Sequence, residues 1–212
     1  MKKKTQQAER AHVALKEAFL QIYKDNEIQN ISVSHIAQRA GYSRGTFYRH
    51  FDSPYDILAE IENDIIRHLN ALIFSLLKEH TPSKNLAFPS QQLEPFWNQF
   101  IKYMQENEKL LYVMFSAHLP ETLVEKIKSM VSGFFYFFIP PQLKSRPETD
   151  FLVAGLTAME VELFLRYFSD PQKISFDKLI KLVYSFAEIS SILTTKIFGG
   201  IGDWGELPSG EN

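Results

Sequence analysis

The sequence predicts an all-α protein with two domains, an N-terminal three-helix module and a larger C-terminal helical domain. Through most of the 212 residues, apolar side chains recur three and four positions apart, which places them on one face of a helix. No stretch shows sustained two-residue alternation of apolar and polar side chains, so no sheet is expected. Serine caps and proline-bearing breaks separate the helical stretches.

The N-terminal module is predicted to hold a first helix over residues 6–24 and two short helices within residues 31–51. Ser32 stands where a helix N-cap should be, and Gly41 supplies the left-handed backbone that ends a helix at low steric cost. Ser43 then caps the second short helix. The apolar stripe of the first short helix consists of Val33, Ile36, Ala37 and Ala40. This is the pattern of a helix-turn-helix, whose second helix enters the DNA major groove.

The second short helix, predicted over residues 43–50, is anchored by Phe47 and Phe51, which leaves polar side chains on its other side. Arginine reads guanine, while hydroxyls and ring nitrogens suit phosphate oxygens. Gly45 costs a helix roughly 1 kcal/mol against alanine, which makes sense if a DNA strand comes close. The predicted DNA contacts are Ser43, Arg44, Gly45, Thr46, Tyr48, Arg49 and His50. The alternative is a packed helical hairpin with a mixed polar face.

A family resemblance is carried by Ile36-Ala37, Ala40-Gly41, Ser43, Gly45-Thr46-Phe47-Tyr48 and His50-Phe51. This pattern resembles the DNA-binding signature of the tetracycline-repressor (TetR) family of bacterial transcription regulators, over about residues 10–60. The resemblance implies that the positions contacting DNA are Arg44, Gly45, Tyr48, Arg49 and His50. It also implies phosphate binding at Thr46 and Tyr48.

Pro54 departs from the family pattern, which usually has a backbone-contacting lysine at this position. Ser53 followed by Pro54 is still a good helix start, a cap followed by proline at the first helical position. The resemblance therefore implies that one phosphate contact is missing, with weaker affinity and a flatter salt dependence. A helical interaction module that has lost DNA binding is the corresponding alternative.

Charge is distributed unevenly along the chain. Residues 1–51 contain nine Lys or Arg and four Asp or Glu, whereas the remainder contains 14 basic and 21 acidic side chains. This asymmetry predicts a polyanionic partner at one end of the molecule. The absence of cysteine excludes disulfides and thiolate metal sites. The sequence shows neither a signal-peptide core nor an apolar run long enough to span a membrane, so a soluble, cytoplasmic protein is expected.

The remaining helices are predicted at residues 53–78, 93–106, 108–117, 120–139, 148–168 and 174–198, with a proline-bearing loop at 81–92. The long helix over 53–78 reaches beyond the small module and links it to the second domain. The predicted division is a DNA-binding domain over 1–52, a regulatory and dimerisation domain over 53–198 and a flexible tail over 199–212.

Dimerisation is predicted from the helix over 148–168, which is apolar nearly all round and so needs neighbours on every side. One chain offers too few helices to cover it, which indicates a second copy of the protein. The family resemblance implies that the last two helices pair with their symmetry mates as a four-helix bundle. A two-fold homodimer implies a palindromic operator read by recognition helices about one DNA turn (~34–36 Å) apart.

An effector site is predicted among the aromatic residues of the C-terminal domain, although core packing also explains them. Glu160 has apolar helical neighbours, so its carboxylate would be costly to bury unpaired. It could pair with Arg166 or another basic residue, or meet a cationic or hydroxylated ligand. Glu162 and Arg166 are predicted to form an ordinary i,i+4 pair. The predicted ligand contacts are Phe100, Tyr103, Phe115, Glu160 and Phe164.

The combined prediction is a dimeric transcriptional regulator, a repressor released from its operator by an effector bound in the C-terminal domain. The alternative is an activator or adaptor controlled by a protein partner instead of a small molecule. The sequence holds no catalytic motif, and no cofactor or metal is expected. The glycine spacing at residues 200–205 matches a dinucleotide fingerprint but follows a helix and not a strand, so no such site is expected.

Overall fold

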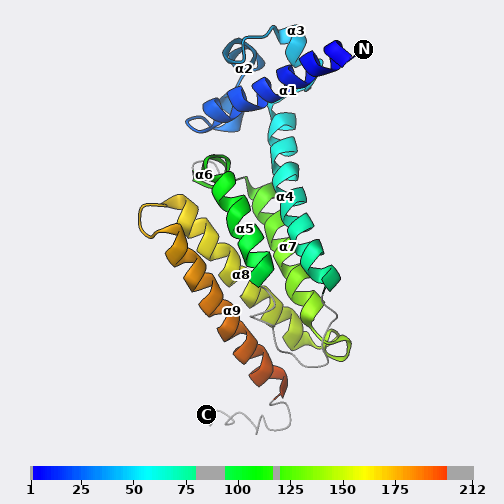
Figure 1. The fold of residues 1–212 in the computed structure, drawn as a ribbon, viewed down its shortest axis with the longest axis vertical. Helices are drawn as coiled ribbons and strands as arrows, with labels where there is room; N and C mark the ends of the chain where they lie inside the picture. The colour runs from blue at the N-terminus through cyan, green and yellow to red at the C-terminus, as the bar shows by residue number, and fades with distance from the viewer. Residues whose placement is uncertain (1, 80–93, 117–119, 200–212) are drawn as a thin grey trace, which may run out of the picture. The chain divides into compact units, whose positions relative to one another are not determined.

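The computed structural model describes residues 2–79, 94–116 and 120–199, and within these ranges the chain contains helices and no strand (Figure 1). The predicted all-α fold is confirmed. The predicted loop at 81–92, the glycine-rich motif at 200–205 and nearly all of the predicted tail lie outside the described residues.

Every predicted helix is present within a few residues of its expected bounds. The α-helices are α1 (Lys2–Tyr23), α2 (Val33–Arg39), α3 (Arg44–Phe47), α4 (Pro54–Glu79), α5 (Glu94–Glu106), α6 (Glu108–Ser116), α7 (Glu121–Phe138), α8 (Pro147–Ser169) and α9 (Phe176–Gly199). Two short 3-10 turns that the sequence did not predict are η1 (Ile28–Asn30) and η3 (Pro141–Leu143).

The helix predicted over residues 43–50 is shorter than expected, because α3 ends at Phe47. After Phe47 the backbone tightens, since Arg49 N–H donates to the Thr46 carbonyl at 3.2 Å and His50 N–H donates to the Phe47 carbonyl at 2.8 Å. These bonds close over three residues, as in a 3-10 turn, instead of four. The helical course therefore continues toward Phe51 as a tighter turn.

The chain forms two compact units. Unit 1 comprises residues 1–71 and 103–124, and unit 2 comprises residues 72–102 and 125–212. The first part of α4 and all of α6 thus pack with the helix-turn-helix, and α4, α5 and α7 each continue from one unit into the other. Whether residues 1–52 fold independently remains a prediction.

The core of unit 1 joins the helix-turn-helix to α1, α4 and α6. Its fully buried side chains come from helices that are far apart in the sequence, which fixes the module on its supporting helices. They are Leu15, Phe19, Tyr23, Ile36, Phe47, Ile57, Ile65, Leu111, Met114 and Leu123.

The core of unit 2 lies between α7 and α8, and α9 runs beside α8 (Figure 1). Its main cluster consists of Phe135, Ile139, Leu143, Val153 and Leu156. One face of α8 is buried, but the opposite face is exposed in a single chain. That exposed face consists of Phe151, Ala154, Gly155, Ala158 and Glu162. The helix is therefore covered on one side only, and Phe151 is 82% exposed.

Candidate nucleic-acid interface and regulatory site

The backbone of the helix-turn-helix is set by three residues whose roles the sequence predicts. Ser32 Oγ accepts the His35 N–H at 3.2 Å and so caps α2. Gly41 adopts a φ of +75°, the left-handed conformation that reverses the chain after α2. Ser43 Oγ accepts the Thr46 N–H at 3.1 Å and caps α3. All three predictions are confirmed, and together they fix the turn between the two helices.

Two phenylalanines hold α3 against the rest of unit 1, as predicted. Phe47 is completely buried and Phe51 nearly so, with their ring centroids 5.9 Å apart. The His12 ring of α1 stacks on Phe51 at 4.7 Å. Because the inward side of α3 is packed in this way, its remaining side chains are left for another partner.

The predicted DNA contacts lie on the outer side of this turn. Five of them are exposed and the other two, Thr46 and His50, are half-buried. Arg49 Nη2 donates to Thr46 Oγ1 at 2.9 Å, and the same hydroxyl lies 3.1 Å from Ser43 Oγ. The arginine is therefore held against α3 in the free protein. The exposed five are Ser43, Arg44, Gly45, Tyr48 and Arg49.

Gly45 has no internal reason to be glycine. A Cβ built on it would come no closer than 3.8 Å to another atom, the Ser43 Oγ, and its backbone needs no positive φ. Alanine would therefore fit, and it would favour the helix by roughly 1 kcal/mol. The choice of glycine is consistent with the predicted close approach of a partner from outside.

The start of α4 is held by Asp56, whose part the sequence analysis missed. Its Oδ2 accepts the backbone N–H groups of Asp52 at 2.9 Å and Ser53 at 2.8 Å. Pro54 is buried as the first residue of the helix. An acidic residue in the first turn also complements the positive end of the helix dipole.

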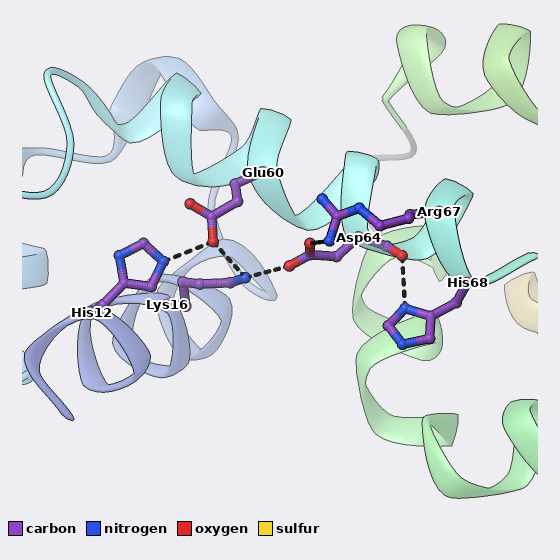
Figure 2. Close-up of polar contacts among 6 residues, drawn as sticks. All are labelled: His12, Lys16, Glu60, Asp64, Arg67 and His68. Carbon is purple, nitrogen blue, oxygen red and sulfur yellow. Dashed lines mark hydrogen bonds and ion pairs between the residues drawn. The ribbon is translucent and has the colours of Figure 1, made fainter. Parts of the chain in front are cut away.

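An ionic cluster joins α1 to α4, as Figure 2 shows. Glu60 Oε1 lies 2.7 Å from His12 Nε2 and 2.9 Å from Lys16 Nζ. Lys16 Nζ also lies 2.6 Å from Asp64, whose other oxygen pairs with Arg67 at 2.9 Å. The sequence analysis missed this cluster, because its partners lie 44 to 48 residues apart.

The ionic cluster shifts the pKa of Glu60, Asp64 and Lys16 toward their charged forms. Burial alone would raise the pKa of the Glu60 and Asp64 carboxyls, but the hydrogen bonds and charges of Lys16 together with those of His12 or Arg67 lower both. The pKa of Lys16 is raised, because the two carboxylates outweigh its burial. The nearby His50 has a lowered pKa through burial and the positive charges of His12 and Arg49. His50 therefore favours its neutral form.

A second polar link lies deeper in unit 1. Glu62 of α4 is 3% exposed, and Thr122 Oγ1 of α7 donates to its Oε1 at 2.8 Å. Tyr23 of α1 is also buried, and desolvation together with the Glu62 charge raises its pKa to about 12. A buried carboxylate thus couples α4 to α7 and acts electrostatically on α1.

The predicted ligand contacts divide between the two units. Phe100 and Phe164 belong to unit 2, where their rings meet at 5.4 Å. Tyr103 and Phe115 belong to unit 1. Tyr103 stacks on His68 at 5.5 Å, and burial, with the Asp64 charge, raises its pKa to about 12. A common ligand for all five residues stays a prediction.

Glu160 is buried without a salt bridge or hydrogen bond to any residue that the structure describes. Arg166 does not pair with it but with Glu162, at 2.6 Å, as the i,i+4 spacing predicts. Desolvation raises the pKa of Glu160 to about 7. One turn earlier, the sequence analysis missed Thr157, whose buried Oγ1 also has no hydrogen-bond partner. Its position three residues before Glu160 could have indicated a shared face.

The described part of the chain offers no group of side chains arranged to hold a metal ion. Its helices are also too short or too polar to span a bilayer.

Comparison with known proteins identifies the helix-turn-helix. Residues 20–61 match the model of the bacterial regulatory proteins of the tetR family. The HTH-type transcriptional regulator YxbF of Bacillus subtilis strain 168 is 27% identical over 106 residues, which are 50% of this chain and 27% of that protein. The chain therefore aligns with only about a quarter of this curated relative.

The whole described fold also has counterparts among solved structures. A TetR transcriptional regulator from Streptococcus agalactiae 2603V superposes with a TM-score of 0.58 at 21% identity, covering 87% of this chain and 97% of that one. The fatty acid degradation regulator FadR from Bacillus halodurans gives a TM-score of 0.59 at 18% identity, with 84% and 94% covered. At these identities the likeness shows the fold.

Proposed function

We propose that this chain, which belongs to the TetR family of bacterial transcriptional regulators, is a dimeric repressor released from a palindromic operator by an effector. Residues 43–50 would read the operator, and unit 2 would bind both the effector and the second copy. The single observation that carries the DNA-binding part is the exposed set of donors on a turn fixed by two serine caps and one left-handed glycine.

The DNA-binding part is supported by charge and by fit. Arg44 and Arg49 are exposed on the outer side of α3, and the first 51 residues carry the basic excess of the chain. Arginine can form two hydrogen bonds with guanine in the major groove. On DNA, Arg49 would exchange its bond with Thr46 for a base or a phosphate. The small Gly45 would let the backbone of α3 approach a DNA strand.

Dimerisation is supported by the exposed faces of α8 and α9. Phe151 on α8 is 82% exposed, and Leu182, Ile189 and Ile192 lie exposed along one face of α9. Around Gly155 a Cβ would meet nothing within 4 Å, so another helix can approach closely there. Large exposed apolar side chains aligned on neighbouring helices are typical of an interface between subunits.

Gly155→Arg tests this interface. The substitution places a charge in the proposed contact while leaving the single chain undisturbed, so light scattering should show monomers. Gly133→Arg on α7 is the matched control, because its Cβ position is equally open and it lies on another helix. A Gly155→Arg protein that remains dimeric would contradict the proposed interface.

Release would follow from a shift between two conformations, one favoured by DNA and the other by the effector. The chain of α4, α5 and α7 continues between the units, and these helices would carry the change from unit 2 to unit 1. The Glu62–Thr122 bond and the ionic cluster of His12, Lys16 and Glu60 would transmit it toward the helix-turn-helix.

The experiment is to incubate the full chain with fragments of its genome, sequence the bound DNA and measure affinity by fluorescence anisotropy at several salt concentrations. Affinity should fall as salt rises, since phosphate contacts release counterions. Arg49→Ala should cost about 1–3 kcal/mol of specific binding if this residue reads a base. Lys173→Ala, which removes an exposed charge beyond α8, is the control.

Two experiments test the proposal separately, one for DNA binding and one for repression. If the protein binds no duplex even in dilute buffer, the DNA-binding part is wrong. A reporter gene behind the bound sequence that is less active in the presence of the protein supports repression, and one that is more active makes the protein an activator.

A further inference from the structure

We infer that Thr157 and Glu160 form the polar centre of a ligand site in unit 2 that takes a protonated amine carried on a compact apolar body. The inference rests on the proposed function, since it names the chemical class of the proposed effector. It begins from two buried polar groups without partners.

The first observation is that neither group has a hydrogen-bond partner among the described residues. Thr157 is 6% exposed and its Oγ1 has no hydrogen-bond partner. Glu160 is 9% exposed, and no described residue forms a hydrogen bond or ion pair with it. An unpaired buried hydroxyl or carboxyl costs on the order of 1–3 kcal/mol or more. Two such groups in one helix indicate that a partner from outside the chain completes them.

The second observation is their alignment. Residues three and four apart share one face of a helix, so Thr157, Glu160 and Phe164 follow one another along the buried side of α8. Both polar groups and an aromatic ring thus face the interior of unit 2. Thr149, earlier on the same face, is satisfied instead, because its Oγ1 donates to the Leu143 carbonyl at 2.6 Å.

The third observation is an aromatic cluster that begins at Phe164, one turn after Glu160 on the same face of α8. The Phe164 ring meets Phe100 of α5 at 5.4 Å, and Phe100 stacks on Phe96 at 6.0 Å. Phe96 in turn stacks on Phe134 of α7 at 6.1 Å. All four rings are only half-buried, so each keeps part of its surface open to contact with a ligand.

These features select a cation over an anion or a neutral molecule. An ammonium group can donate to the Glu160 carboxylate and to the Thr157 hydroxyl at once, which satisfies both groups. The faces of the surrounding rings attract a cation, and they offer apolar contact to the rest of the ligand. An anion would be repelled by Glu160. Above the raised pKa of Glu160, where its carboxylate is charged, a neutral alcohol would form the hydrogen bonds but would leave that charge uncompensated.

The test uses the full chain without DNA and isothermal titration with three probes of nearly equal shape, 2-phenylethylamine, 2-phenylethanol and phenylacetate. The amine should bind and the other two should bind far more weakly. Glu160→Gln should weaken amine binding roughly ten- to hundredfold, the value of a charged hydrogen bond. Thr157→Val should weaken it less, and Glu125→Gln, an exposed carboxylate on α7, should leave it unchanged.

Three results would overturn the inference: no amine binding by the wild-type chain, equal binding of phenylacetate, or a Glu160→Gln variant that binds the amine as well as wild type does. DNA release, measured separately by anisotropy, distinguishes this failure from that of the proposed function. If another class of molecule releases the operator, the repressor proposal stands without this site. If the amine binds and the protein stays on DNA, the ligand site is supported but the amine is not the effector.

Discussion

Unit 1 and unit 2 differ in how some of their buried polar side chains are paired. In unit 1, Glu62 accepts a hydrogen bond from Thr122, and Lys16 bridges Glu60 and Asp64. In unit 2, Thr157 and Glu160 are buried without such partners among the described residues. Satisfied groups hold helices in one arrangement, whereas unsatisfied ones cost free energy until something else pairs with them.

The difference is consistent with a rigid unit 1 and with a unit 2 whose conformation depends on a ligand. The α3 turn must present its donors in one geometry, and the paired groups around α1 and α4 favour that geometry. A regulatory site must instead become more stable when its ligand binds. Unpaired polar groups allow this, because the ligand can form the hydrogen bonds that they lack. If the proposed ligand binds there, the chain contains one region completed by folding and another completed by binding.

The largest effect is expected from removing an aromatic ring in each unit. Phe47→Ala should lower the free energy of unfolding by about 3–5 kcal/mol, because the ring is fully buried beneath α3. Phe164→Ala should cost clearly less, since its ring is only half-buried. Urea unfolding followed by circular dichroism measures both. An equal loss at the two positions would show that unit 2 is packed as tightly as unit 1.

A pH-dependent effect is expected next, from Glu160. Burial raises its pKa to about 7, whereas an unfolded glutamate titrates near about 4.3. Its contribution to stability is therefore fully present below the unfolded pKa and is lost as pH rises through the folded pKa. At about 1.4 kcal/mol per pKa unit, the wild-type chain should lose up to about 3 kcal/mol between acid and neutral pH.

Glu160→Gln isolates that effect, since glutamine does not titrate and other groups cancel in the comparison. The stability of wild type minus that of the variant should become more unfavourable from about pH 5 to about pH 8. A difference that does not change with pH would mean that Glu160 has a partner in solution, and the contrast between the units would weaken.

The sequence predicts the contacts between residues that are close together along the chain, and it does not predict the contacts between distant ones. The caps at Ser32 and Ser43 and the left-handed Gly41 are confirmed, because each acts within four residues of its own position. The His12–Glu60 and Thr122–Glu62 contacts join residues 48 and 60 positions apart, so no local pattern indicates them. They follow only from how the helices pack.

The candidate sites show the same limit. The exposure of Arg44 and Arg49 follows from the period of a helix anchored by Phe47. The shorter α3, however, depends on the tightened backbone after Phe47, and the grouping of Tyr103 with unit 1 depends on its stacking with His68. The sequence indicates Glu160, because a charged residue in an apolar helix is unusual. It does not indicate Thr157, because threonine is common in helices.

A smaller effect is expected from breaking the ionic cluster at its centre. Lys16→Met removes the cation shared by Glu60 and Asp64, and about 1 kcal/mol should be lost at neutral pH, because the pair is partly exposed and screened. The lowered pKa of both carboxyls means that their stabilising effect is present above their unfolded pKa and is lost as pH falls. The stability difference should therefore shrink in acid, and a difference that persists there would indicate lost packing.

The smallest effect on the fold, and the sharpest on function, is expected at Gly45. Gly45→Ala should leave the chain as stable as wild type or more stable by up to roughly 1 kcal/mol, because alanine favours the helix and its Cβ meets nothing closer than 3.8 Å. Gly133→Ala on α7 should give a similar gain, since its Cβ position is also open.

The two alanines should differ only on DNA. If a strand lies against α3 at Gly45, the added methyl pushes it away and weakens neighbouring contacts, each worth about 1–3 kcal/mol. Anisotropy with the sequenced operator should then show a loss for Gly45→Ala and none for Gly133→Ala. Equal affinity for both variants would mean that the exposed glycine faces water in the complex, and the reading surface would have to lie toward Arg44 and Tyr48 instead.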